Sequence, residues 1–159
     1  TMQTKLPLAA KAHVRWMIRR DMSEVLAIEA DSFGEEAWSE EDFHEILRQR
    51  NAIGMVVELG DQIAAYMVYE MHKNRLHVLN FAVSYLFRRE GIGSKMVEKL
   101  KSKLRIGNRY AINLEINERN LKAQLFFRDH GFKCISVLKN FYDFSTLDAY
   151  LFRFEVEPR

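Results

Sequence analysis

The stretch FRREGIGSKMV, residues 87–97, decides how this chain folds. It places Gly91 and Gly93 where a helix-forming run begins, with Arg88 and Arg89 directly before them. A glycine inside a helix costs about 1 kcal/mol relative to alanine, so two of them need a reason. The start of a helix offers unpaired backbone N–H groups that bind phosphate, and arginine adds fork-shaped donors. The stretch therefore indicates either a phosphate-binding helix start or a loop whose glycines only turn the chain.

The rest of the chain alternates between patterns typical of strands and of helices. Gly60-Asp61 predicts a two-residue hairpin, Ser39 with Asp42 a capping box, Asp21 a helix cap and Gly131 a helix end. The expected strands are residues 13–19, 53–59, 62–71, 75–83, 110–117, 132–138 and 149–156, and the expected helices follow Asp21 and Ser39 and span 91–105 and 120–130. This order predicts an α/β fold with a mixed sheet and helices on both faces.

Composition narrows the class of protein. Of 159 residues, 48% are hydrophobic and 29% charged, so we expect one globular domain, in residues 13–159. We expect residues 1–12 to form a tail. The net charge of +2 gives little reason to expect a nucleic-acid partner. No apolar run approaches the roughly 18 residues of a membrane span, and the N-terminus lacks a signal-peptide pattern. From this we expect no membrane partner. Because Cys134 is the only cysteine, we also expect a reducing compartment and hence a cytoplasmic protein.

The spacing of the two glycines excludes a Walker A loop and lacks the third glycine of the dinucleotide fingerprint. Residues 88–93, R-R-E-G-I-G, instead resemble the [RQ]-x-x-G-x-[GA] segment of the GNAT superfamily of N-acetyltransferases. Within it, the chain is most similar to the RimI-type ribosomal-protein-alanine N-acetyltransferases. The segments that carry this similarity are SFGEEAWSEEDF (32–43), LEINERNLKAQLFFRDHGF (114–132), NFY (140–142) and DAYLF (148–152). The resemblance implies the GNAT fold, a mostly antiparallel sheet splayed between the strands at 75–83 and 110–117.

The same resemblance implies acetyl-CoA as the acetyl donor and no metal. Its cofactor-binding positions fall on Phe81, Ala82 and Val83 for the pantetheine arm, on Arg88, Arg89, Glu90, Gly91, Ile92, Gly93 and Ser94 for the pyrophosphate, and on Asn120, Ala123 and Phe127 along the last helix. Asn120 also suits a simple helix N-cap, and both roles stay open.

A protonated amine cannot attack a thioester, so acetyl transfer needs a base. In the strand YAINLEIN, Glu115 shares one face with Asn113 and Asn117, while isoleucine and leucine side chains fill the other face. The resemblance implies that Glu115 is the base, with a structural carboxylate as the alternative. His77 lies where other GNAT branches place a carboxylate base, which makes it the reserve candidate, with a hydrogen-bonded structural histidine as the alternative.

One position departs from the RimI-type pattern. The tyrosine that protonates the departing thiolate is replaced by Phe127, which has no proton to donate. Tyr142 or a water molecule is the expected substitute. Tyr142 suits the peptide entrance equally well, together with Phe33 and Trp38, so these three residues are the expected substrate-binding residues.

The ease of deprotonation separates the candidate acceptors. At pH 7, freeing the base form costs about 1 kcal/mol for an α-amine and about 4.6 kcal/mol for a lysine. Together with the resemblance, this difference in free energy favours the α-amine of a protein or peptide N-terminus as the acceptor. Separately, we expect the protein to be a monomer or weak dimer. A GNAT enzyme acting on a small-molecule amine stays open. So does a non-catalytic acyl-CoA sensor or scaffold, which the loss of the tyrosine at Phe127 would favour.

Overall fold

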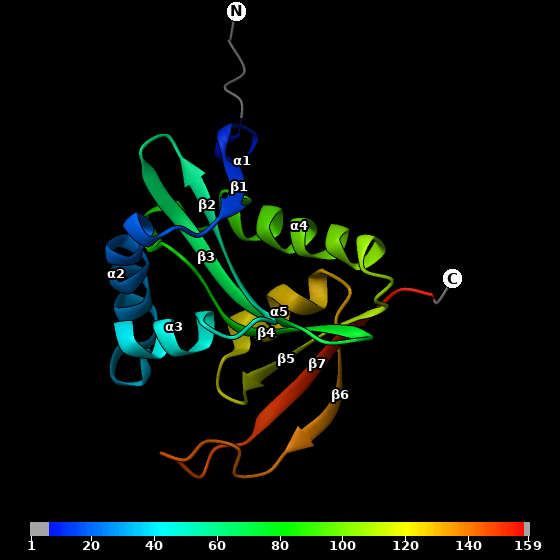
Figure 1. Cartoon of the computed structure of the whole chain (residues 1–159). Helices are drawn as coiled ribbons and strands as arrows, with labels where there is room; N and C mark the ends of the chain where they lie inside the picture. The colour runs from blue at the N-terminus through cyan, green and yellow to red at the C-terminus, as the bar shows by residue number, and fades with distance from the viewer. Residues whose placement is uncertain (1–6, 158–159) are drawn as a thin grey trace, which may run out of the picture. The chain divides into compact units, whose positions relative to one another are not determined.

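The structure is a computed structural model that describes residues 7–157 (Figure 1). Residues 1–6 of the expected tail, and the last two residues of the expected domain, lie outside the described residues. Within the tail, the short helix α1 spans Leu8–Lys11, an element that the sequence did not predict. The division into a tail and one domain stays a prediction.

Helices and strands follow one another in the predicted order. The strands are β1 (His13–Trp16), β2 (Ala52–Leu59), β3 (Gln62–Met71), β4 (Arg75–Val83), β5 (Ala111–Asn117), β6 (Lys133–Leu138) and β7 (Ala149–Glu155). The helices are α2 (Met22–Phe33), α3 (Glu40–Leu47), α4 (Ile92–Ile106) and α5 (Leu121–Asp129), with 3-10 turns η1 (Arg19–Asp21), η2 (Gly34–Glu36) and η3 (Tyr85–Phe87).

In the described part of the chain the strands form one seven-stranded sheet in the order β1-β2-β3-β4-β5-β7-β6. The pairs β1–β2, β5–β7 and β6–β7 are antiparallel, and β4–β5 is parallel. The β4–β5 register runs only from Arg75 opposite Ala111 to His77 opposite Asn113, near the start of both strands. The predicted mixed, mostly antiparallel sheet is therefore confirmed.

The chain divides into two compact units. The first comprises the described part of Thr1–Tyr69 together with Asn80–Leu100, and the second comprises Glu70–Leu79 with the described part of Lys101–Arg159. In the first unit, Phe43 of α3 packs edge-on against Tyr66 of β3, and both rings are fully buried. In the second unit, the buried rings of Phe127 and Phe132 pack against each other with centroids 5.1 Å apart.

The capping box at the start of α3 is confirmed. The Ser39 hydroxyl accepts a hydrogen bond from Asp42 N at 3.1 Å, and the Asp42 carboxylate accepts one from Ser39 N at 2.9 Å. Gly131, which follows α5, has a φ of 87°, the left-handed conformation expected of a helix end. Both local signals were read from the sequence because they need only a few neighbouring residues.

The role predicted for Asp21 is wrong, although α2 does begin after it. Its side chain does not cap α2. The carboxylate instead accepts hydrogen bonds from the Arg15 guanidinium at 2.7 and 2.8 Å and from Ile18 N at 2.8 Å. Strand β1 ends at Trp16 and not at residue 19, and η1 begins at Arg19, after the extended residue Ile18.

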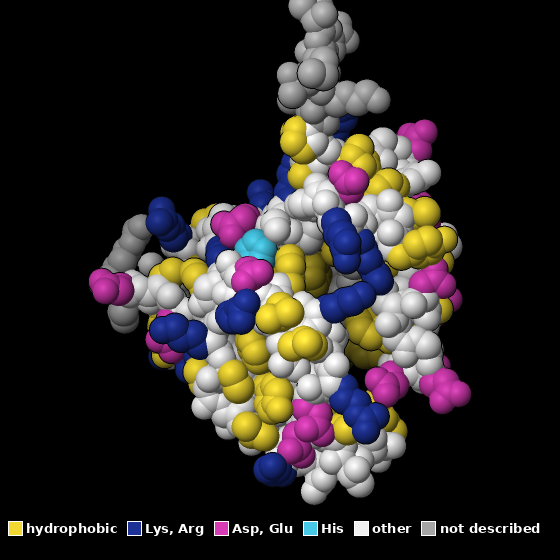
Figure 2. All heavy atoms as spheres, turned by 180° about the vertical axis from the view of Figure 1, so that it is seen from behind, with side chains coloured by type: hydrophobic (Ala, Val, Ile, Leu, Met, Phe, Trp, Pro, Cys, Tyr) yellow, Lys and Arg dark blue, Asp and Glu magenta, His cyan; other side chains and the backbone are white. Residues whose placement is uncertain are grey.

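Charges of both signs occur on one face of the molecule. In Figure 2, Lys and Arg side chains lie among Asp, Glu and apolar side chains. This mixture agrees with the small net charge of +2. Within residues 7–157, no helix has the length and apolar character needed to cross a membrane.

Candidate active site

The glycine-rich stretch forms an exposed turn that leads into α4. Arg88, Arg89, Glu90 and Gly91 are all exposed, and Arg89 and Gly91 have positive φ angles of 63° and 80°. A left-handed conformation costs a residue with a side chain roughly 1–2 kcal/mol, so glycine suits this position. Helix α4 begins at Ile92, directly after the turn. An exposed turn thus leads into a 15-residue helix whose first residue, Ile92, is buried and whose next two, Gly93 and Ser94, are half-buried.

Two cations near this turn have partners within the protein. Arg88 Nε donates to the carbonyl oxygen of Val83 at 3.2 Å, which ties the turn to the end of β4. Lys95 Nζ donates to the carbonyl oxygens of Ala9, at 2.7 Å, and Ala12, so it holds the end of α1 against α4. At least part of the charge in this region therefore positions the backbone.

The end of β4 supplies the other expected cofactor positions in the first unit. Ala82 is buried, while Phe81 and Val83 are half-buried. Directly after the strand, Ser84 N donates to Ala64 O at 2.8 Å, so this segment is fixed to β3. The assignment of the three residues to a pantetheine arm stays a prediction.

Strand β5 presents Glu115 as the sequence pattern predicted. Ile112, Leu114 and Ile116 are buried, and the Glu115 side chain, which points to the other face, is 21% exposed. Asn113, two residues earlier, has a buried side-chain oxygen without a hydrogen-bond partner among the described residues. The face that carries Glu115 is therefore polar and partly open.

His77 and Glu115, named separately as alternative bases, form a pair. His77 Nε2 lies 2.7 and 2.9 Å from the two carboxylate oxygens of Glu115, across the parallel β4–β5 contact. This hydrogen bond raises the pKa of His77, against the opposing effect of its burial. A ring nitrogen that donates to Glu115 cannot accept a proton at the same time. The arrangement therefore favours the structural alternative for His77, a histidine that orients Glu115.

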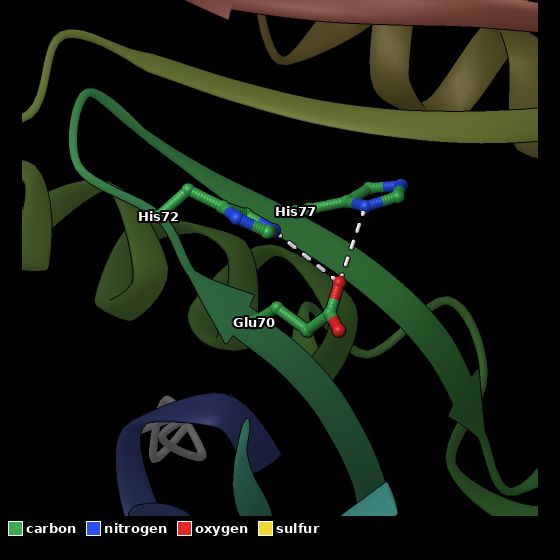
Figure 3. Close-up of side chains that lie close together, drawn as sticks. All are labelled: Glu70, His72 and His77. Carbon is green, nitrogen blue, oxygen red and sulfur yellow. Dashed lines mark hydrogen bonds and ion pairs between the residues drawn. The ribbon is translucent and has the colours of Figure 1, made fainter. Parts of the chain in front are cut away.

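Sequence reasoning missed two residues beside this pair. Glu70, near the end of β3, has its Oε1 atom 3.5 Å from His77 Nδ1 and 3.3 Å from His72 Nε2 (Figure 3). The signal was present as Glu-x-His followed five residues later by a second histidine, around the turn between two predicted strands. Figure 3 shows the two rings converging on one carboxylate oxygen.

Helix α5 places Asn120, Ala123 and Phe127 in the second unit. Asn120 caps the helix, because its side-chain oxygen accepts a hydrogen bond from Ala123 N at 3.1 Å. The N-cap role is confirmed, and contact of Asn120 and Ala123 with the cofactor stays a prediction. Phe127 is only 3% exposed and packs edge-on against Phe126 and Phe132.

The loop that carries Trp38 is held by a buried carboxylate that sequence reasoning also missed. Glu29 of α2 is 1% exposed and accepts hydrogen bonds from Trp38 N at 3.0 Å, from the Tyr66 hydroxyl and from Asn80 Nδ2. Glu29 lies seven residues after Met22 and four after Val25, so it falls on the buried stripe of α2, which is a signal in itself. Phe33 ends the same helix and is half-buried.

Tyr142 lies in the connection between β6 and β7. Its ring contacts Phe141 and Phe144, with centroids 5.1 and 5.4 Å away, and both neighbours are exposed. Asp148 closes the connection by accepting hydrogen bonds from Asn140 N and Lys139 Nζ. Tyr142 is thus part of a surface aromatic group, which fits an entrance for a substrate.

These features match a known family. The acetyltransferase (GNAT) family matches residues 20–132, and the chain belongs to this family. The matched range includes the turn at residues 88–93, His77 and Glu115.

Individual relatives narrow the similarity. A Bacillus subtilis protein named as a candidate ribosomal protein bS18-alanine N-acetyltransferase is 26% identical over 143 residues, which is 89% of this chain and 94% of the relative. The crystal structure of the Escherichia coli ribosomal-protein-S18-alanine N-acetyltransferase superposes with a TM-score of 0.81 at 19% identity, covering 92% and 94% of the two chains. Arabidopsis thaliana NAA60 in complex with acetyl-CoA has the same fold, with a TM-score of 0.76 at 14% identity over 91% and 98%.

Proposed function

We propose that this chain transfers the acetyl group of acetyl-CoA to the α-amine of a protein N-terminus. Family membership supports the acetyl transfer, because the match spans most of the chain. The named function of the Bacillus subtilis relative supports a ribosomal protein as the acceptor. An acceptor of that kind also fits the expected cytoplasmic location.

The turn before α4 fits the pyrophosphate of acetyl-CoA. Gly91 is exposed, has a φ of 80° and presents no side chain, so an anion can approach the first amides of α4. Gly93 and Ser94 of the first helical turn and Arg89 of the turn are the other groups proposed to hold it. When bound, acetyl-CoA supplies an acetyl group activated as a thioester.

Glu115 is the proposed base, and its pairing with His77 is the observation that carries this assignment. Two contacts of 2.7 and 2.9 Å from one ring nitrogen fix the orientation of the carboxylate. A carboxylate held in place on a partly open polar face can take the proton of an incoming amine, directly or through a water molecule. His77 then acts as a positioning residue.

Deprotonation supports an α-amine as the acceptor. At pH 7 the base form of an α-amine costs about 1 kcal/mol to form, against about 4.6 kcal/mol for lysine, so a single carboxylate suits the α-amine. The exposed aromatic group around Tyr142 is a surface on which the first residues of a peptide can pack.

A peptide assay tests the proposal. The purified protein is mixed with acetyl-CoA and peptides that begin with different residues, while the release of free thiol is followed. Each peptide is paired with a second peptide of the same sequence in which the N-terminus is acetylated and one internal residue is lysine. In this second peptide, the lysine is the amine left free. We expect thiol release only with the free N-terminus. Release with both peptides would move the acceptor to lysine, and binding of acetyl-CoA without any release would favour a sensor.

A further inference from the structure

The turn between β3 and β4 gathers three groups that can ligate a metal. Glu70 lies near the end of β3, His72 directly after it and His77 within β4, so one hairpin carries all three. One potential ligand atom of each residue lies within 4.8 Å of the other two. The side chains of Glu70, His72 and His77 are 19%, 33% and 22% exposed, so an ion from solvent can reach them.

The two contacts of Glu70 Oε1 are long, and the one to His72 Nε2 is a long hydrogen bond, so their lengths also suit ligands around one ion. Glu70 Oε1 is 3.3 Å from His72 Nε2 and 3.5 Å from His77 Nδ1. A charge-assisted hydrogen bond between such groups is shorter, about 2.7–2.9 Å. In a tetrahedral zinc site with bonds of about 2.0–2.1 Å, neighbouring ligand atoms lie about 3.3–3.4 Å apart. The two measured separations are close to that spacing.

The second nitrogen of His77 provides an independent observation. Nε2 donates to Glu115, so in the neutral ring the lone pair is on Nδ1, the atom that faces Glu70. A histidine that ligates a metal almost always donates its other ring N–H to a carboxylate or carbonyl, which fixes the tautomer. His77 has this arrangement, with Glu115 as the orienting carboxylate (Figure 3 shows the Nδ1 side).

His72 is also fixed. Its backbone N donates to Arg75 O at 2.9 Å, and its carbonyl oxygen accepts from Arg109 Nε at 2.6 Å. The backbone that presents the ring is therefore held from both sides, and a bound ion need not order this turn.

From this geometry we propose that Glu70, His72 and His77 bind a divalent transition-metal ion, Zn²⁺ being the best fit, with a water molecule as the fourth ligand. Two imidazole nitrogens and one carboxylate oxygen are a ligand set that zinc accepts. Magnesium and calcium prefer sites made of oxygen alone, so they should bind here poorly. This proposal does not rest on the proposed acetyl transfer, because the experiment that tests it measures metal binding.

Calorimetry with ZnCl₂ and chelator-treated protein tests this site. We expect saturable binding by the parent, and at least a tenfold loss of affinity in each of His72→Ala and Glu70→Gln. His44→Ala is the matched control, because His44 has a carboxylate neighbour, Glu40 at 3.8 Å, but belongs to no three-group cluster in the described part of the chain. It should bind like the parent. MgCl₂ should give no comparable heat.

Two further measurements keep the test decisive. Far-ultraviolet circular dichroism must show the parental fold in both variants, and Co²⁺ should give the visible absorption of a four-coordinate site only with the parent and the control. Glu115→Ala, which removes the orienting carboxylate, should weaken Zn²⁺ binding about 10- to 100-fold. The proposal would be overturned if the parent showed no saturable Zn²⁺ binding. It would also be overturned if the parent and the two ligand variants bound Zn²⁺ with equal affinity.

Discussion

His77 Nε2 lies 2.7 Å from one carboxylate oxygen of Glu115 and 2.9 Å from the other. If Glu115 is the base, Glu115→Gln should lower kcat by roughly 10²- to 10⁴-fold and leave the affinity for acetyl-CoA nearly unchanged. His77→Ala should reduce kcat by a smaller factor, because the carboxylate remains. Steady-state kinetics on a free peptide N-terminus would measure both effects. Glu155→Gln, an exposed carboxylate on β7, is the control and should behave like the parent. A larger loss in His77→Ala than in Glu115→Gln would move the base to β4.

Gly91 and Gly60 share a backbone conformation but differ in their surroundings. Both have positive φ, 80° and 60°, so a valine at either position costs roughly 1–2 kcal/mol of backbone strain. A Cβ at Gly91 would in addition lie 3.3 Å from Ala9 Cβ, whereas a Cβ at Gly60 would have no described atom within 4 Å. Only the Gly91→Val side chain would lie at the turn before α4, and it should weaken acetyl-CoA binding at least tenfold. Gly60→Val, in the β2–β3 hairpin, should bind like the parent. Calorimetric titration of acetyl-CoA into both variants measures this. Equal affinity of the two variants for acetyl-CoA would show that the pyrophosphate does not bind at this turn.

Local signals in the sequence were sufficient for most of the fold. The capping box of Ser39 and Asp42, the hairpin at Gly60-Asp61 and the helix end at Gly131 depend on residues close in the chain, and all three are present. Asp21 has the same local signal as a helix cap, but Arg15 is close enough in space to bind it. A charged partner from another element outcompetes the helix amides, and a local pattern does not contain that partner.

The site was predicted residue by residue, but its pairings were not. The sequence named His77 and Glu115 as competing bases, because the resemblance placed their two strands side by side but neither strand pattern gave the register between them. The parallel β4–β5 register brings them together, and it joins residues 38 apart in the chain. Glu70 and His72 were missed for the same reason, since each alone is an ordinary polar residue at the edge of a strand.

Glu29 accepts three hydrogen bonds in a fully buried position, from Trp38 N, the Tyr66 hydroxyl and Asn80 Nδ2. Glu29→Gln should reduce the free energy of unfolding by about 1–3 kcal/mol, because the new amide group points N–H donors at groups that are themselves donors. Urea unfolding followed by tryptophan fluorescence would measure it. Glu45→Gln, an exposed glutamate of α3, is the control and should change stability little. Equal unfolding free energies for the two variants would contradict a structural role for Glu29.

The Arg15–Asp21 ion pair makes stability depend on pH. Hydrogen bonds from Arg15 hold the pKa of the Asp21 carboxyl below its usual value of 3.8, despite its burial. A lowered pKa in the folded state gives stability that is present above the unfolded pKa and lost as the pH falls through the folded pKa. Asp21→Asn should therefore cost about 2 kcal/mol at neutral pH and progressively less below about pH 4. Urea unfolding at several pH values checks this, with Asp31→Asn on the exposed side of α2 as the control. A cost that does not change with pH would show that the pair contributes no charge-dependent stability.

Phe127→Tyr tests the absence of a general acid. Phe127 is 3% exposed and packs against Phe126 and Phe132, so a new hydroxyl would be largely buried. Without a hydrogen-bond partner that hydroxyl should cost about 1–3 kcal/mol of stability. If it instead lies where the departing thiolate forms, kcat should rise several-fold, with a smaller gain at high pH, where a thiolate leaves unaided. Measuring kcat and the unfolding free energy of the same variant separates these outcomes. A loss of stability without a gain in kcat would show that Phe127 serves the core alone. The damaging change should then be Tyr142→Phe, if Tyr142 supplies the proton.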